Sequence, residues 1–317
     1  MTITASEPRI YVDRTTTWHA IGKDVSQCKD MEHVLKASGL DYNVVKRPLY
    51  FGNSWDDENP YNELVNRFVT VRASDNHPYD VVSDKFEIVQ NRDAFDFVNY
   101  MGDEVSFEKA GETATGMVYI IAKLPDVDIL GDTFTPHVIF RNGFNAKVKI
   151  TAAICPLRLV CQNQFNFAFK NAENTVTVRH VQNAEQKLQE ARETLRMTAD
   201  YMTELHEMAE RYAAIGISEF QFQRFLKEAF PMEGAENMNP FKRAKLEQAR
   251  NAFIKAHKAE DNQNFRGTAW GLINAYSDFI THQVPQGKTE TRFEGKFVQV
   301  TFGGSMNKVL DLIERVA

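Results

Sequence analysis

Three hydrophobic runs of strand length follow one another in the middle of the chain. The segments 116–124 (GMVYIIAKL), 134–142 (FTPHVIFRN) and 147–155 (KVKITAAIC) are three successive strand-like runs. Asn142–Gly143 between the second and third run is a strong hairpin signal. Pro156 is predicted to end the third strand, and residues 158–171 have room for a short helix. The pattern therefore predicts a β-β-β-α order across residues 116–170.

The hydrophobic period changes to that of a helix in the second half. Residues 183–214 predict one long helix, which begins with a capping-box pattern at Asn183 and Gln186 and stops at Gly216. Two rows of residues recur every seven positions along it: Leu188, Leu195, Met202 and Ala209, and Ala191, Thr198, Leu205 and Tyr212. This seam either packs on the rest of the protein or joins two copies of the chain, and the pattern allows both.

The remaining segments complete the prediction of the fold class. A short helix between Asp30 and Gly39 precedes a strand, and an acidic, proline-containing loop follows at 55–63. Helices are predicted at 218–230, 241–258 and 265–283, then a strand at 291–302 and a final helix capped by Ser305. The chain is predicted to be α+β: a β-rich N-terminal half with the β-β-β-α core, then a long helix and a largely helical C-terminal half. We expect two domains, 1–182 and 183–317.

Composition narrows the class of protein. Hydrophobic residues make up 43% of the 317 residues and charged residues 25%, as in ordinary soluble globular proteins. Three cysteines are too few for a disulfide framework and indicate a reducing compartment. Neither a signal peptide nor an apolar run of 18 residues is apparent. We expect a cytoplasmic protein that does not associate with membranes.

Charge is distributed unevenly. The chain as a whole carries −6, which excludes a globally basic nucleic-acid-binding protein. Residues 137–180, however, hold six Lys or Arg against Glu173, a net +5 that leaves −11 for the rest. Phenylalanines and side-chain amides are interleaved with these cations. Cations that contact phosphates beside aromatic rings that stack on bases are typical of single-strand binding.

The same residues have a structural interpretation. Phe165 and Phe169 are four residues apart and would bury one helical face, whereas Lys147 and Lys149 alternate as on the solvated face of an edge strand. The basic region therefore has two interpretations. It contacts nucleic acid, or it is a surface that faces solvent or binds another acidic partner. A separate basic helix is predicted at 241–258, where six Lys or Arg accompany Glu247.

Metal and nucleophile chemistry have less support. Cys155 and Cys161 do not have zinc-ligand spacing and lack a second pair, so neither a metal nor a cofactor is expected. Catalytic phosphate-loop, serine-elbow and zinc-protease motifs are absent from the sequence. An enzyme would have to use a constellation such as Cys161, His180 and Asn163, which one sequence cannot bring together.

Two segments carry a resemblance to a known family. CPLRLVCQNQFNFA (155–168) and VRHVQNAEQKLQEARETL (178–195) resemble the signature of the phage/plasmid-like proteins, a domain of unknown function carried by phages, prophages and plasmids. Further matches span the chain, from TWHAIGKDV (17–25) to FGGSMNK (302–308). The signature residues Arg158, Cys161, Asn163, Arg179 and His180 are all present. The resemblance implies a mobile-element protein in a bacterial cytoplasm and no established activity.

The leading hypothesis is a non-enzymatic protein that binds single-stranded DNA, with strand annealing in recombination or replication as a possible use. The β-β-β-α order is similar to the core of single-strand annealing recombinases, which form rings or filaments, so a homo-oligomer is expected; this is an analogy of fold. The predicted nucleic-acid-binding residues are Arg141, Lys147, Lys149, Arg158, Lys170, Arg179, His180, Phe144, Asn163 and Phe167. The alternatives are an assembly protein that uses helix 183–214 on a host or phage partner, and an unrecognised enzyme that uses Cys161 and His180.

Overall fold

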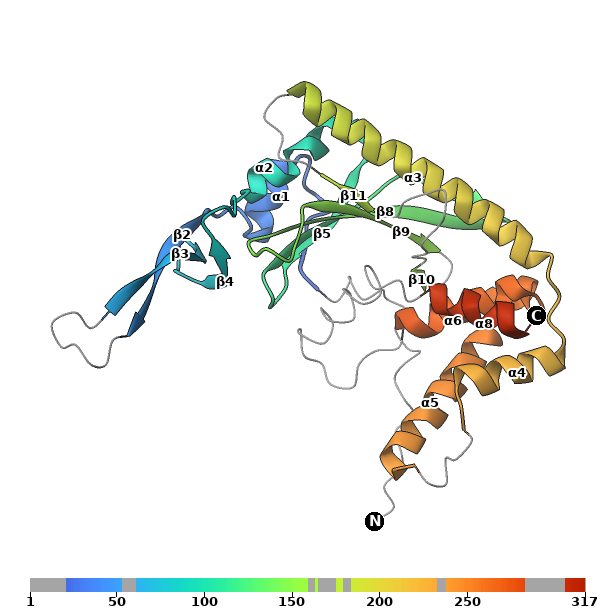
Figure 1. The fold of residues 1–317 in the computed structure, drawn as a ribbon. Coiled ribbons are helices and arrows are strands. Elements are labelled where there is room, and N and C mark those ends of the chain that lie inside the picture. The colour runs from blue at the N-terminus through green and yellow to red at the C-terminus, as the bar shows by residue number, and fades with distance from the viewer. Residues whose placement is uncertain are drawn as a thin grey trace, which may run out of the picture.

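The computed structural model describes residues 21–52, 61–158, 163–164, 175–178, 184–232, 238–282 and 306–316. Antiparallel sheets occupy the N-terminal half and helices the C-terminal half, which confirms the predicted α+β class. A main sheet lies at the centre, and the long helix α3 crosses one side of it (Figure 1). A three-stranded sheet projects to the left in the same view.

The main sheet is antiparallel throughout and follows the order β1-β5-β6-β8-β9-β10, with β7 paired to β8 and β11 paired to β9. Its strands are β1 Lys23–Asp24, β5 Ser106–Glu112, β6 Met117–Lys123, β7 Val127–Ile129, β8 Asp132–Gly143, β9 Thr151–Arg158, β10 Asn163–Gln164 and β11 Thr175–Thr177.

Both faces of this sheet are covered at its centre. On one face Val118, Ile120, Val138 and Phe140 belong to a core shared with the N-terminal helices. On the other face Tyr119, Ile121, Ile139 and Cys155 form a second buried cluster. Burial on both sides explains why β6 is a nearly continuous hydrophobic run and not a simple alternation.

The β8–β9 hairpin differs from its prediction at both ends. Strand β8 runs through Asn142 and Gly143, so the turn lies at residues 144–150. The prediction that Pro156 ends the next strand is wrong, because β9 continues to Arg158 and Pro156 lies opposite Pro136.

The register explains how β9 tolerates this proline. The Pro136 carbonyl accepts a bond from the Leu124 amide, so the hydrogen-bonding edge of Pro136 faces β6 and the pair with Pro156 is not hydrogen-bonded. On its other side β9 pairs with β11 as far as Ala153 and with β10 from Leu157. Within the described residues Pro156 lies between these two partners, where a missing N–H costs no ladder bond.

The three predicted β-strands of the β-β-β-α order are present as β6, β8 and β9. The predicted helix at 158–171 falls mostly outside the described residues. Where it is described, Arg158 ends strand β9 and Asn163–Gln164 form the short strand β10.

A second sheet forms the projection. Strand β3 (Tyr61–Arg72) is its central strand and pairs antiparallel with β2 (Val44–Gly52) and β4 (Pro78–Ser83). The pairing of β2 with β3 extends well beyond β4, so a two-stranded ribbon points away from the body (Figure 1). We call β2 and β3 together the ribbon. The predicted acidic loop at 55–63 lies at its end, and residues 53–60 of that loop lie outside the described residues.

Short helices pack where the two sheets meet. Helix α1 (Met31–Ser38) begins at Asp30, whose side chain accepts the His33 amide, and ends at Gly39 in the left-handed conformation, as predicted. Helix α2 (Asn91–Phe95) and the 3₁₀ helices η3 (Asp96–Tyr100) and η4 (Gly102–Glu104) follow. Their apolar side chains fill the first core together with β6 and β8.

Helix α3 (Ala184–Ala213) confirms the long helix predicted at 183–214. Its seam residues Ala191, Thr198, Met202 and Leu205 are buried within the protein's own cores. These buried seam residues therefore pack on the chain itself, while Leu188 and Leu195 are half-buried.

The C-terminal helices form the third cluster of the core with the distal half of α3. They are α4 Glu219–Ala229, α5 Pro240–His257, the 3₁₀ helix η6 Glu260–Phe265, α6 Ala269–His282 and α8 Asn307–Val316. Ile129, Phe134 and Ile154 of the main sheet join this cluster, so the sheet and the helices share one core. The domain division at 182/183 stays a prediction. Ser305 and the predicted strand 291–302 lie outside the described residues.

Across the described ranges, none of the helices combines the length and the apolar character needed to span a membrane.

Candidate functional site

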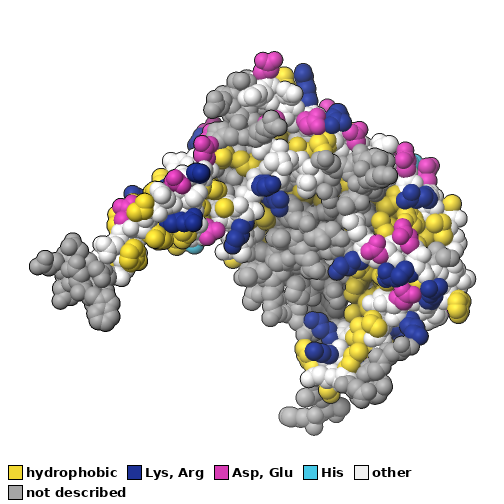
Figure 2. All heavy atoms as spheres, in the orientation of Figure 1, with side chains coloured by type: hydrophobic (Ala, Val, Ile, Leu, Met, Phe, Trp, Pro, Cys, Tyr) yellow, Lys and Arg dark blue, Asp and Glu magenta, His cyan; other side chains and the backbone are white. Residues whose placement is uncertain are grey.

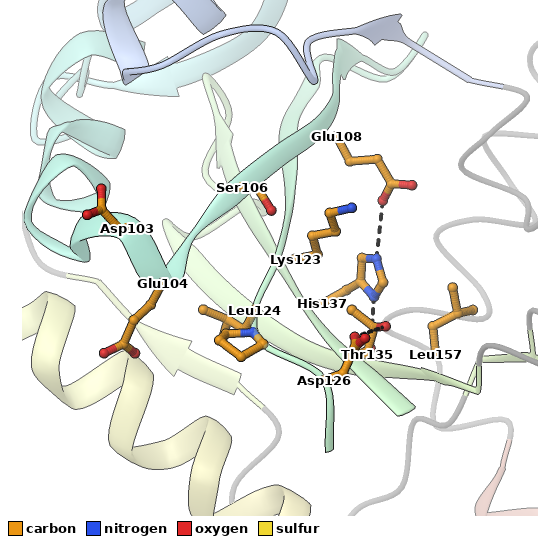
Figure 3. Close-up of a pocket in the computed structure, with 11 residues that line it drawn as sticks. Asp103, Glu104, Ser106, Glu108, Lys123, Leu124, Asp126, Thr135, His137 and Leu157 are labelled. Carbon is orange, nitrogen blue, oxygen red and sulfur yellow. Dashed lines mark hydrogen bonds and ion pairs between the residues drawn. The ribbon is translucent and has the colours of Figure 1, made fainter. Parts of the chain in front are cut away.

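A polar pocket of about 530 Å³ lies at one end of the main sheet. Strands β5, β6, β8 and β9 and the 3₁₀ helix η4 each contribute to its wall (Figure 3). The lining residues are Asp103, Glu104, Ser106, Glu108, Lys123, Leu124, Pro125, Asp126, Thr135, His137 and Leu157.

A histidine–carboxylate pair forms the inner part of the pocket. His137 is almost completely buried on β8, and its Nε2 lies 3.2 Å from Glu108 Oε2 on β5. Its Nδ1 lies 3.0 Å from the Thr135 carbonyl, which can only accept, so Nδ1 carries a proton. The pair therefore places a basic nitrogen and a carboxylate oxygen side by side in the inner wall of the pocket.

Carboxylates dominate the rest of the pocket. Thr135 Oγ1 donates to Asp126 at 2.6 Å, and Asp103 and Glu104 are exposed at the opposite side. Lys123 extends toward the space between Glu108 and His137 (Figure 3). Four carboxylates against one lysine make the pocket electronegative, so it repels phosphate groups. Among the described side chains, no group of three or more potential ligands is arranged to hold a metal ion.

The signature segment contributes one wall of this pocket. Leu157 lines it, and Arg158 pairs with Asn163 across the β9–β10 ladder at the same end of the sheet. Pairing brings these two predicted site residues together, although only their backbone is described. The predicted residues Lys170, Arg179, His180 and Phe167 lie outside the described residues, as does Cys161 of the predicted enzyme constellation.

The three predicted cations that are described with their side chains differ in exposure. Lys147 and Lys149 are exposed on the turn between β8 and β9. Arg141 is partly buried on β8, where its Nε donates to Thr151 Oγ1, and burial lowers the pKa of its guanidinium group. The two lysines are therefore the described members of the predicted set that are accessible to a phosphate.

Phe144 belongs to the core, which corrects its prediction as a base-stacking residue. Its side chain is fully buried. The ring packs between Tyr42 and Tyr79, with centroid separations of 5.9 and 5.1 Å. The Phe144 carbonyl accepts a 2.7 Å bond from Thr70 Oγ1 of β3. Phe144 therefore joins the hairpin turn to the base of the ribbon and cannot stack on a base.

Arg72 completes the base of the ribbon. Its guanidinium group lies 4.4 Å from the Tyr42 ring centroid and donates to Glu112 Oε2 of β5 at 2.7 Å. Tyr42 donates to the same carboxylate oxygen at 2.9 Å. We call Tyr42, Arg72, Tyr79, Glu112 and Phe144 the root cluster. Because its members come from several separate segments, the root cluster fixes the ribbon to the main sheet.

The ribbon carries aromatic side chains that do not pack on the body. The exposed fractions are 56% for Tyr50, 53% for Phe51 and 71% for Tyr61. Arg47 and Arg67 are exposed on the same two strands. Figure 2 shows hydrophobic, Lys or Arg, and Asp or Glu side chains interspersed along this projection. These residues were not among the predicted site residues; the signal that could have indicated them is the aromatic pair Tyr50–Phe51 shortly before the acidic loop.

A second exposed combination of the same kind lies on α5. Residues 241–245 at the start of this helix are all exposed, whereas Leu246 and Ala249 pack against the core. The exposed start carries Phe241, which is 73% exposed, together with Lys242, Arg243 and Lys245. Lys and Arg side chains gather over α4 and α5 in Figure 2. The basic helix predicted at 241–258 is confirmed as a helix with an exposed cationic face.

Comparison with protein families matches residues 78–299 to a model described as a domain of unknown function (DUF932). Neither the curated proteins nor the solved structures contain a match to the chain.

Proposed function

The chain belongs to the DUF932 family, whose function is unknown, and on that premise we propose from its geometry that it binds single-stranded nucleic acid. The observation that carries the proposal is the ribbon, whose two strands carry both exposed aromatic rings and exposed arginines. Single-strand binding that tolerates many sequences requires this combination, because rings stack on bases and cations neutralise phosphates.

The register supports stacking on one face of the ribbon. Tyr50 lies opposite Glu63, and Tyr61 lies opposite Gly52, so the two tyrosines share a face as diagonal neighbours. Diagonal neighbours are about 7–8 Å apart. A base between two rings needs about 7 Å, twice the 3.4 Å rise between successive bases. Gly52 has no side chain, which leaves space beside the Tyr61 ring.

Cations beyond the ribbon extend the proposed interface. Lys147 and Lys149 lie on the hairpin turn whose Phe144 packs against the base of the ribbon. The exposed start of α5 adds Lys242 and Arg243 beside Phe241. The acidic pocket lies apart from this role, since its carboxylates repel phosphates.

The proposal includes the biological setting that the signature resemblance implies. We place the protein in a phage or other mobile element, acting in the cytoplasm of a bacterial host. Strand annealing during recombination or replication is the use that we favour, because it needs a strand held by its backbone with bases accessible.

The test is fluorescence anisotropy of a labelled oligothymidine at several salt concentrations with the full chain. If Arg47, Arg67, Lys147 and Lys149 each neutralise one phosphate, log K falls with log salt at a slope of about −2.8, from roughly −0.7 per phosphate. Replacing Tyr50 and Tyr61 by alanine removes two stacking contacts, each worth about 1–3 kcal/mol.

Val65→Ala is the matched control, because Val65 is exposed on the same strand but has no ring. It should leave the affinity unchanged, whereas Tyr50→Ala/Tyr61→Ala should lower the affinity by at least tenfold. Binding that is absent at low salt, or equal in the tyrosine variant and the wild type, would refute the proposal.

A further inference from the structure

The outer face of α4 contains a groove of about 630 Å³. It is lined by Phe220, Gln223, Arg224, Lys227, Glu228 and Pro231. Phe220, Arg224 and Lys227 are spaced by four and three residues, so they follow one face of the helix. Phe220 is 78% exposed, whereas the next aromatic residue of α4, Phe222, is buried. The groove thus presents an uncovered aromatic surface along a helix that is otherwise anchored in the core.

The described lining of the groove carries a net charge of +1, from Arg224 and Lys227 against Glu228. Glu228 accepts bonds from Arg224 at 3.3 Å and from Arg315 of α8 at 2.9 Å, so two guanidinium groups share its single negative charge. Lys227 lies on the same exposed face. An apolar surface with a cationic rim is complementary to a segment that has an aromatic residue and several carboxylates.

The chain itself contains such a segment. Residues 53–60, NSWDDENP, hold Trp55 followed by three carboxylates and include no Lys or Arg. This segment connects the end of β2 at Gly52 to the start of β3 at Tyr61. The end of the ribbon and α4 lie at opposite ends of the molecule (Figure 1), so they meet only between two copies.

We propose that the α4 groove of one copy receives residues 53–60 of a second copy. Trp55 packs against Phe220 and Pro231, and the carboxylates face Arg224 and Lys227. Because each copy then offers its ribbon on one side and its groove on the other, the contact is head-to-tail and builds a ring or an open chain. This proposal does not rest on nucleic-acid binding, and the assembly does not use the buried seam of α3.

Sedimentation velocity of the full chain, without nucleic acid, tests the assembly. The wild type should form oligomers whose fraction rises with protein concentration and falls in high salt. Arg224→Glu/Lys227→Glu reverses the groove, and Asp56→Lys/Asp57→Lys reverses the segment. Each variant should weaken association about tenfold or more, because exposed pairs worth up to about 1 kcal/mol become repulsive.

Combining the two reversals in one chain restores opposite charges and should restore assembly. Lys29→Glu is the matched control, since Lys29 is exposed and belongs to neither surface, so its reversal should change nothing. A labelled peptide with the sequence NSWDDENP should also bind the wild type and not the groove variant. A monomer at all concentrations, or oligomers that neither reversal affects, would overturn the proposal, as would a combined variant that stays monomeric.

Discussion

Replacing Phe144 by alanine tests whether this ring is a structural element of the root cluster or a ligand-binding residue. The side chain is fully buried and contacts two aromatic rings, Tyr42 and Tyr79. Truncating a buried phenylalanine costs about 3–5 kcal/mol, and each lost aromatic pair contributes about 0.5–1.5 kcal/mol within that range. We expect the free energy of unfolding to fall by about 4 kcal/mol.

Urea denaturation followed by circular dichroism measures this change, with Phe144→Leu as the conservative variant. Leucine keeps most of the apolar contact and should cost less than about 1.5 kcal/mol. Among molecules that remain folded, single-strand affinity should be unchanged, because the ring does not reach solvent. The reasoning is refuted if Phe144→Ala costs less than about 1 kcal/mol, or if it weakens DNA binding at unchanged stability.

Three further outcomes are expected. Burial raises the pKa of Tyr79 to about 12, above the value near 10 of an unfolded tyrosine. The native state therefore holds this proton more tightly, and the free energy of unfolding falls as the pH rises from 10 to 12. Tyr79→Phe should flatten that decline in thermal melts recorded at a series of pH values. Burial lowers the pKa of His257, so the neutral imidazole stabilises the fold above about pH 6.5 and this stability is lost as the pH falls. His257→Phe keeps the ring stacked on Phe222. Its urea midpoint should therefore fall less than that of the wild type between about pH 7 and pH 5. Ser218 caps α4 in a reciprocal capping box with Gln221, so Ser218→Ala should cost about 1 kcal/mol in urea denaturation, and a cost near zero would show that the cap is dispensable.

Local sequence patterns correctly predicted those helices and strands whose buried positions can be recognised within the segment itself. The hydrophobic runs in 116–142 and the heptads of 183–214 identified β6, β8 and α3, because the apolar positions that each element buries lie within its own segment. Asp30 and Gly39 identified both ends of α1 for the same local reason.

The errors arose where a residue's role depends on a distant strand. Pro156 is tolerated in β9 because of its place between β10 and β11, and no local pattern contains that register. Phe144 looked like a stacking ring beside lysines, but Tyr42 and Tyr79, more than 60 positions away in sequence, cover it. The exposure of Tyr50 and Tyr61 likewise follows from the absence of a third strand beside the far end of the ribbon in the described residues. Pairing between segments distant in sequence therefore determined which of these side chains are buried and which are exposed.

The length of the ribbon has a consequence for any repeating assembly. Nine residues of β2 at about 3.3 Å each extend roughly 30 Å from a root that Arg72, Glu112 and Phe144 hold fixed. If the end of the ribbon contacts a neighbour, this length sets the spacing between successive copies, and hence the length of strand that each copy covers. Inserting two residues into each strand would lengthen the repeat by about 7 Å while leaving both contact surfaces unchanged.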